Sequence, residues 1–389
     1  MPAPAPSAPT SAPAVVNLFA YNGLVIGTWA ASLAALRERL GLDASGIAIM
    51  LVAAGVAAIT AMQVGGRLGD RFGARRVALA SLPLLTGGLL LAGFAGGYLA
   101  LFIAALLLGL GNGAIDVAMN AIGVQVEASR PKPIMSFFHG MWSVGNFAGA
   151  GLVFIAALAM PAVAVQAAAL LATVVGVAAG IVALRFTPET AAVSHADESG
   201  VKTPIPRWAY LLGLMAIAFG LGEGTAMDWS GLHVTEVAGI PAAQGSLAVT
   251  VVAGFMVAIR LLGDALVARF GRRAVVRFGG ACSALGYMIT ALATPLPMLL
   301  IGWGLVGFGI GMIAPQVYAV AGHAAGGRGL AVVVTFGYAT FLCGPAVIGF
   351  LAGHLGLQRA MFVPAVLLAA LPFLASVMPA DERPQKITA

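Results

Sequence analysis

Long apolar runs separated by short polar or glycine-rich breaks dominate the pattern of residues along this chain. A helix needs roughly 20 mostly apolar residues to cross the hydrocarbon core of a bilayer. Twelve runs are long enough, and each is predicted to form a transmembrane helix. The predicted spans are 14–36, 46–67, 76–96, 98–126, 134–158, 162–185, 207–234, 242–262, 274–293, 296–321, 329–353 and 357–378.

The longest polar interruption, 187–206, lies in the middle of the chain and is predicted to be a cytoplasmic linker between two six-helix bundles. The bundles would then cover 14–186 and 207–379. Residues 1–13 are rich in Pro, Ala and Ser and contain no Lys or Arg. They lack the basic region of a secretory signal and are predicted to be a disordered tail. Residues 380–389 are predicted to be a C-terminal tail.

A short motif recurs at the same place in each predicted bundle. The stretch after the second span reads GGRLGDRFGARR at 65–76, and the stretch after the eighth reads RLLGDALVARFGRR at 260–273. Both contain Gly-Asp, then Arg-Phe-Gly, then a basic pair. This recurrence predicts two bundles related by a pseudo-two-fold axis along the membrane normal.

Composition supports an all-α integral membrane protein over a set of soluble domains. The chain is 60% hydrophobic and 9% charged, whereas soluble domains carry about 25% charged residues. No P-loop or Cys/His spacing suggests a nucleotide, metal or other cofactor. Cys282 and Cys343 lie in apolar stretches and are predicted to be packing residues.

The net charge of +6 is interpreted through membrane topology, and no nucleic-acid partner is expected. With the N-terminus in the cytoplasm, every Lys and Arg falls on the cytoplasmic side except Arg37, Arg39 and Arg359. Basic residues resist translocation. Both termini are therefore predicted to face the cytoplasm in a multi-pass protein of a bacterial-type inner (plasma) membrane.

The motif at 65–76 resembles the one between helices 2 and 3 of the major facilitator superfamily. The resemblance covers nearly the whole chain and implies a monomeric twelve-helix transporter that binds a small molecule. It also implies a cytoplasmic charge latch that favours the outward-facing state; the alternative is a topology anchor with ordinary surface ion pairs. The matching positions are Gly66, Gly69, Asp70 and Arg71, with Asp264 and Arg269 in the second copy.

Three further runs resemble the MosC-type branch of that superfamily. They read DVAMN at 116–120, SFFHGMWS at 136–143 and EGTAMDWS at 223–230. The branch is named for a rhizopine gene cluster, which implies an amino-inositol-like solute. The fourth span lacks the arginine of the drug/proton antiporters, and the fifth lacks their Gly-Pro motif. Both absences weigh against the alternative of a multidrug or lipophilic-cation exporter.

Polar residues line one face of the fourth predicted span. Asn112, Asp116 and Asn120 follow at intervals of four residues, so they share a helical face, and the two asparagines alone would suit hydrogen bonding between helices. Ionisable groups within a membrane are costly and usually face the protein interior or a water-filled cavity. Asp116 is therefore predicted to be a substrate or proton site, and the alternative is hydrogen bonding between helices.

The fifth span carries His139 and Ser143 on one face, beside Trp142. If spans four and five form a hairpin, Asp116 and His139 lie about one turn apart in height. They could relay a proton, or His139 could form a fixed structural hydrogen bond. A hydrolytic triad of Asp116, His139 and Ser143 is the enzyme alternative, which the missing Gly-x-Ser-x-Gly elbow disfavours.

The seventh span carries Glu223, Asp228 and Trp229. The two acids point about 140° apart on an ideal helix, so both can face one cavity only if the helix bends or unwinds. Glu223 is predicted to face the cavity, and Asp228 to be a gate or helix-end residue. The resemblance implies that spans 1, 4, 7 and 10 line the cavity, where Asn22 and Gln316 are further candidates.

His233 is predicted to be an interfacial helix-end residue, and no Lys or Arg is placed at mid-membrane. A carrier of phosphates or carboxylates needs a cation to offset desolvation of its substrate. Neutral sugars, polyols and amines are therefore favoured. The function predicted is secondary transport by alternating access, coupled to protons through Asp116 or Glu223. A receptor that binds solute without moving it is the remaining alternative.

Overall fold

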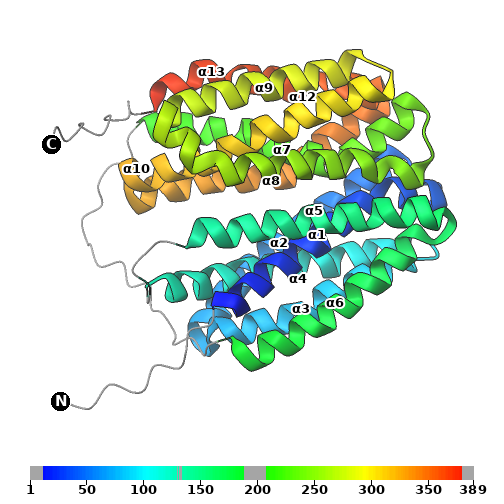
Figure 1. Cartoon of the computed structure of the whole chain (residues 1–389), viewed down its shortest axis with the longest axis horizontal. Helices are drawn as coiled ribbons and strands as arrows, with labels where there is room; N and C mark the ends of the chain where they lie inside the picture. The colour runs from blue at the N-terminus through cyan, green and yellow to red at the C-terminus, as the bar shows by residue number, and fades with distance from the viewer. Residues whose placement is uncertain (1–11, 129, 131–133, 188–206, 379–389) are drawn as a thin grey trace. The chain divides into compact units, whose positions relative to one another are not determined.

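The computed structural model describes residues 12–128, 130, 134–187 and 207–378, and nearly all of them are helical (Figure 1). No strand occurs within these ranges. Eleven described helices are long and apolar enough to cross a membrane, and a shorter apolar stretch covers Cys343–Leu355. The predicted all-α membrane fold is confirmed.

Contacts between residues divide the chain into two compact units. The first comprises Met1–Leu42 and Ile49–Glu198, and the second comprises Asp43–Ala48 and Ser199–Ala389. The predicted linker, apart from Thr187, and both predicted tails, apart from Ala12 and Pro13, lie outside the described residues.

The first half of the chain contains six long helices. They are α1 (Ala12–Leu40), α2 (Ala44–Phe72), α3 (Ala74–Gly93), α4 (Tyr98–Ala128), α5 (Met135–Ala159) and α6 (Ala164–Phe186), with the short 3-10 helix η1 (Pro161–Val163) before α6. α5 packs chiefly on α1, and α4 packs chiefly on α3. The sequence predicted that α5 pairs with α4 in a hairpin, and this is wrong, because the main neighbour of α5 is α1.

The second half begins with α7 (Arg207–Ala238), η2 (Ala242–Gly245), α8 (Ser246–Phe270) and α9 (Arg272–Leu292). It continues with α10 (Leu296–Leu355), α11 (Leu357–Ala360), α12 (Phe362–Ala369), α13 (Leu371–Leu374) and η3 (Ala375–Val377). α7 packs chiefly on α10.

The recurring motif lies mostly on helix and not in a loop. α2 and α8 extend beyond the predicted spans and end at single glycines, Gly73 and Gly271. These have φ values of 89° and 81°, a region that glycine adopts without steric cost. Their amides donate to Gly69 and Val267 with the same 2.8 Å distance. The two corners are thus alike in conformation as well as sequence.

The same close glycine contact occurs once within each unit, at positions separated by a constant number of residues in the sequence. Gly109 lies against the carbonyl of Ala54, where α4 crosses α2. Gly307 lies in the same way against the carbonyl of Val252, where α10 crosses α8. The interval from Gly109 to Gly307 equals that from Gly73 to Gly271. Small residues allow such close backbone approach between membrane helices, so the repeat seen in the motif extends to helix packing.

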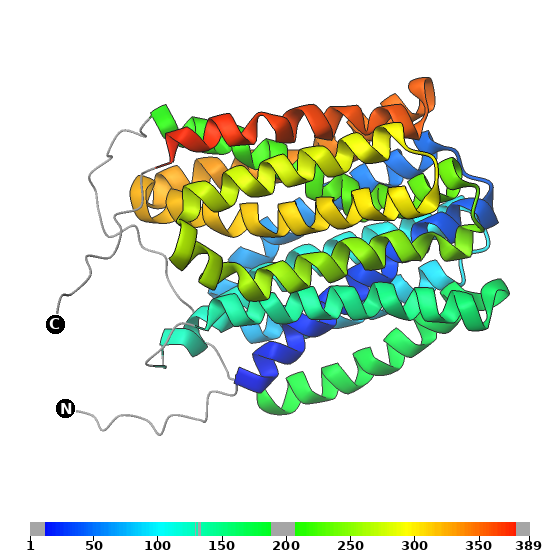
Figure 2. The same ribbon diagram turned by 45° about the horizontal axis from the view of Figure 1, so that its top comes forward.

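α10 contains both predicted spans 296–321 and 329–353 in one continuous helical element. A straight helix would separate Tyr318 from Gly337 by about 28 Å at 1.5 Å per residue. The Tyr318 hydroxyl nevertheless lies 2.6 Å from where a Cβ on Gly337 would sit. The element therefore folds back, and Figures 1 and 2 show it turning where its colour passes from yellow to orange.

The last predicted span, 357–378, is divided into the short segments α11, α12, α13 and η3. Pro364 and Pro372 lie within this stretch. Proline has no N–H to donate and clashes with the preceding turn, so it interrupts regular α-helical bonding. Bonds of the tighter i to i+3 type close the breaks, as from the amide of Ala370 to Leu367. The stretch is still apolar and long enough to span a membrane.

Candidate functional site

A buried amide and indole network joins three helices of the first unit. Asn22 of α1 is 1% exposed. Its amide nitrogen donates to Asn112 Oδ1 of α4 at 2.9 Å, and its Oδ1 accepts from Trp142 Nε1 of α5 at 2.6 Å. Two predicted candidates, Asn22 and Trp142, are thus in direct contact.

Glycines set the spacing between α1 and α5 that this network requires. A Cβ on Gly23 would overlap the carbonyl oxygen of Trp142, and one on Gly27 would overlap that of Asn146. From the other side, Gly145 and Gly149 lie against the carbonyls of Ala20 and Leu24. The two backbones are therefore in contact, which places Trp142 within hydrogen-bonding reach of Asn22.

Replacing Asn22 with alanine is expected to destabilise the first unit by about 1–3 kcal/mol, because the Trp142 indole and the Asn112 carbonyl lose their buried partner. Trp142→Phe is the matched control, since it removes the donor and keeps most of the ring. A fall in melting temperature for Asn22→Ala no larger than that for Trp142→Phe would contradict a network centred on Asn22.

Asp116 is half-buried in α4 and is bonded within its own helix. The Asn120 amide donates to the Asp116 backbone carbonyl at 2.8 Å and to its carboxylate Oδ1 at 3.3 Å. The two predicted candidates thus share one helix face and are in contact. A single amide at 3.3 Å is weak compensation for a carboxylate inside a membrane span.

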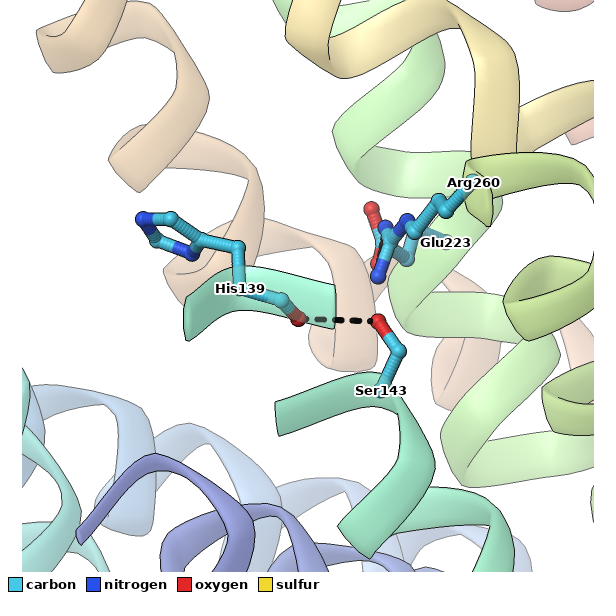
Figure 3. A network of polar contacts seen from close by, with 4 residues as sticks. All are labelled: His139, Ser143, Glu223 and Arg260. Atoms are coloured by element: carbon cyan, nitrogen blue, oxygen red, sulfur yellow. Dashed lines mark hydrogen bonds and ion pairs between the residues drawn. The ribbon is translucent and has the colours of Figure 1, made fainter. Parts of the chain in front are cut away.

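His139 and Ser143 lie one turn apart on α5, as their spacing predicts. The Ser143 hydroxyl donates to the backbone carbonyl of His139 at 3.2 Å. Figure 3 shows the His139 ring pointing away from that hydroxyl. The ring packs edge-on against Phe19 of α1, with centroids 5.2 Å apart. This geometry does not match a serine–histidine pair of a hydrolase, and the relay from Asp116 to His139 stays a prediction.

The second unit contains an ion pair between α7 and α8. Arg260 Nη2 lies 3.0 Å from Glu223 Oε1, and the two side chains are 17% and 19% exposed (Figure 3). The prediction that assigned Arg260 to a cytoplasmic loop is wrong, and the absence of a cation at mid-membrane stays a prediction. α8 continues past this residue to Phe270, so Arg260 lies within a membrane helix and neutralises the carboxylate that was predicted to face the cavity.

Aromatic residues surround the Glu223 position. Phe219, one turn earlier on α7, packs edge-on against Tyr318 of α10 with ring centroids 5.5 Å apart. The Tyr287 hydroxyl of α9 donates to the carbonyl of Gly222 at 2.5 Å. The acid thus lies on a wall built from three helices, and a buried tyrosine holds the backbone just before it.

α7 is one helical element from Arg207 to Ala238, so its glycines do not unwind it. Glu223 and Asp228 therefore point about 140° apart. Trp229 is 1% exposed and belongs to the core. Asp228 is half-buried, and among the described residues its carboxylate has no hydrogen-bond or ion-pair partner.

Gln316 of α10 is bonded to the start of α9. Its Oε1 accepts from Arg272 Nη1 at 2.9 Å, at the first residue of α9. Arg272 belongs to the second copy of the recurring motif. Gln316 thus connects α10 to that motif, whereas the sequence predicted that it lines the cavity.

The predicted gating residues lie at the ends of α2 and α8. Asp70, Arg71 and Arg269 are exposed, Gly66 and Gly69 are half-buried, and the side chain of Asp264 lies outside the described residues. Each arginine stacks over the next ring in sequence: Arg71 lies 5.0 Å from the Phe72 centroid, and Arg269 lies 5.3 Å from that of Phe270. The charge latch itself stays a prediction.

Three polar residues that matter in the structure were not predicted as site residues. Asn112 was noticed only as possible helix-to-helix glue, Arg260 was assigned to a loop, and His233 was assigned to an interface. His233 is 0% exposed inside α7. Its position five residues before the end of that helix gave no signal of burial, whereas the spacing of Asn112 and Asp116 did indicate a shared face.

Two segments of the chain match the model of the Major Facilitator Superfamily, residues 15–227 and 212–389. The chain belongs to the major facilitator superfamily. The transporter y4wD of Sinorhizobium fredii is 32% identical to this superfamily member over 366 residues, which cover 92% of this chain and 96% of that one.

Membrane protein MosC of Rhizobium meliloti is 28% identical over 360 residues, with 91% of this chain and 86% of that protein covered. The predicted resemblance is thereby confirmed. A solved structure of a mutant nucleoside transporter, NupG, aligns with a TM-score of 0.73 at 14% identity, covering 94% of this chain and 99% of that one. This superfamily member is therefore a multi-pass membrane transporter, and the enzyme alternative is not carried further.

Proposed function

We propose that this superfamily member is a proton-coupled secondary transporter of a small polar solute of the sugar, polyol or amino-sugar class. The observation that carries the proposal is the polar set within membrane helices: Asn22, Asn112 and Trp142 in contact, with Asp116 and Asn120 on α4. Amides and carboxylates bind hydroxyl groups, and an indole can stack on a sugar face or attract an amine.

The acids of α4 and α7 are the proposed proton and amine sites. Glu223 is already paired with Arg260, and Asp116 has only the Asn120 amide. Asp228 has no partner among the described residues, which suits a carboxylate that receives a proton or an ammonium group from the solute. The solute would bind near mid-membrane, and the two halves would move around it by alternating access.

A thermal-shift screen tests the substrate class. The purified protein would be mixed with inositols, amino-sugars, neutral sugars, lipophilic cations and carboxylates at acidic and alkaline pH. A ligand at a hundred times its Kd stabilises by about 2.7 kcal/mol. Stabilisation by a polyol or amino-sugar supports the proposal. Stabilisation by lipophilic cations alone supports a drug exporter instead.

Asp116→Asn is expected to abolish uptake driven by a pH gradient while leaving solute counterflow in proteoliposomes. The amide keeps the shape and hydrogen-bonding capacity of the carboxyl group but cannot exchange a proton. Glu38→Gln, at an exposed position near the end of α1, is the matched control and is expected to leave both activities intact. Gradient-driven uptake that survives in both Asp116→Asn and Glu223→Gln would contradict proton coupling through these acids.

Binding without counterflow in the native protein would support a receptor.

Arg260 favours a second candidate, a solute that carries a carboxylate. A guanidinium group within a span can offset desolvation of an anion. Such a solute would have to replace Glu223 at Arg260, so its binding would weaken in Arg260→Met and persist in Glu223→Gln. The carboxylates in the screen separate this candidate from the neutral polyols.

The proposed topology places both termini in the cytoplasm and the protein, as a monomer, in a bacterial-type inner membrane. The distribution of Lys and Arg supports this orientation, because basic residues are retained on the cytoplasmic side. Arg37 and Arg39 at the end of α1 and Arg359 in α11 would face outward.

A further inference from the structure

Three fully buried side chains of the second unit have polar atoms without any partner among the residues that the structure describes. They are Ser230 and His233 of α7 and Trp303 of α10, each 0% exposed. The unpaired atoms are Ser230 Oγ, both ring nitrogens of His233, and Trp303 Nε1. Buried polar groups are nearly always hydrogen-bonded, so four such atoms in one region require an explanation.

The three side chains converge where α7, α9 and α10 meet. Ser230 and His233 are three residues apart and share one face of α7. The His233 and Trp303 rings pack edge-on with centroids 5.5 Å apart. Tyr287 of α9 also packs edge-on against Trp303, with centroids 5.4 Å apart. The carbonyl of Thr290 lies close to the His233 ring but does not meet hydrogen-bond geometry.

The unpaired atoms define the chemistry of what they could bind. The indole can only donate, the serine hydroxyl can donate and accept, and a neutral imidazole has one donor and one acceptor. One histidine is too few ligands for a metal, and no group of metal-ligating residues occurs among the described side chains. None of the three residues supplies a fixed charge for an ion. The set suits a small neutral molecule that both donates and accepts, which is water.

We infer that the region between Ser230, His233 and Trp303 is a buried water-binding site. Buried waters characteristically bridge otherwise unsatisfied polar groups with two to four hydrogen bonds. The bound water connects α7 to α10 through the hydroxyl, imidazole and indole groups. The site is distinct from both acids of α7: Ser230 and His233 point about 160° and 140° away from Asp228, and Ser230, on nearly the same face as Glu223, lies about 10 Å further along the helix.

The bound water would fix the position of α7 relative to α10. α7 carries Asp228 on its opposite side and Glu223 two turns before Ser230, and the bound water holds this helix against α10 through hydrogen bonds. Without water, the same contact would consist of unpaired polar atoms. Binding here does not depend on the identity of the transported solute, so the site can be tested independently of the proposed function.

X-ray hydroxyl-radical footprinting of the whole protein in detergent tests the inference directly. Radicals form from bound water where it lies, so His233 and Trp303 should be oxidised several-fold faster than equally buried side chains without water. Phe138 of α5, which is 0% exposed and has a purely apolar ring, is the control within the same sample. Oxidation of His233 and Trp303 no faster than that of Phe138 would overturn the inference.

A matched pair of serine variants provides a second readout. Ser283 of α9 is also 0% exposed, but its hydroxyl donates to its own helix at Gly279 with a distance of 2.8 Å. If water is bound, Ser230→Ala should lower the melting temperature more than Ser283→Ala does, because the water loses a partner. If the region is dry, Ser230→Ala removes an unpaired group and should raise the melting temperature above that of the native protein.

Discussion

Gly27→Ala is expected to lower the stability of the first unit by about 1–3 kcal/mol, the usual effect of forcing extra atoms into a packed interior. The added Cβ would overlap the carbonyl oxygen of Asn146. A carbonyl in a helix cannot move without shifting its backbone, so α1 and α5 must separate. The separation would also lengthen the bond from Trp142 to Asn22, and solute binding should weaken together with stability.

Gly87→Ala on α3 is the matched control for this variant. It is also a helical glycine, and nothing lies within 4 Å of its added Cβ. Alanine favours a helix over glycine by about 0.5–1 kcal/mol in soluble helices, so Gly87→Ala should be neutral or stabilising. Melting temperatures that fall equally in the two variants would show that helix propensity, and not the contact of α1 with α5, determines the result.

Arg260→Met is expected to lower stability by about 2 kcal/mol and to abolish transport. Removing one partner of a buried pair leaves an uncompensated charge that costs several kcal/mol. The cost is smaller here because both side chains keep about a fifth of their surface exposed, at 17% and 19%, and solvent screens the remaining charge. The double variant Glu223→Gln with Arg260→Met should recover part of the lost stability, since no isolated charge remains.

A double-mutant cycle over these variants measures the coupling between the two residues. Arg359→Met, at an exposed arginine of α11, controls for the loss of a positive charge. Recovery of stability without recovery of transport would separate a role in transport from a role in folding. Equal losses for the double variant and for the sum of the single variants would show that the pair is not coupled.

The hydrophobic pattern predicted the helices well because a span is a local property of the chain. The ends of α2 and α8 were placed too early, since charged residues such as Arg67 and Arg260 were interpreted as the start of a loop. Those residues favour helix, and the chain leaves the helix only at Gly73 and Gly271, where φ becomes positive. Charge marks where a membrane helix reaches polar surroundings, but it does not mark where the helix ends.

The sequence indicated which residues of each helix belong to the candidate site. It did not indicate which residues of other helices they contact. The spacing of Asp116 and Asn120 predicted a shared face, and the structure brings the two together. No spacing within one helix reveals which other helix lies opposite. The neighbours of α5 were therefore misassigned, although the glycines at 23, 27, 145 and 149 carried the small-residue signal for close packing of α1 against α5.

The repeated glycine contacts also bear on how the sequence of such a chain can evolve. Gly111 and Gly309 occupy corresponding positions, yet the residue after the first is Asn112, which binds Asn22, and the residue after the second is Ile310, which packs near Gly222. Backbone-to-backbone crossings place few demands on the side chains beside them. One half can therefore acquire a new polar group while the other keeps an apolar one, so solute preference can evolve in each half separately on the same framework of helix crossings.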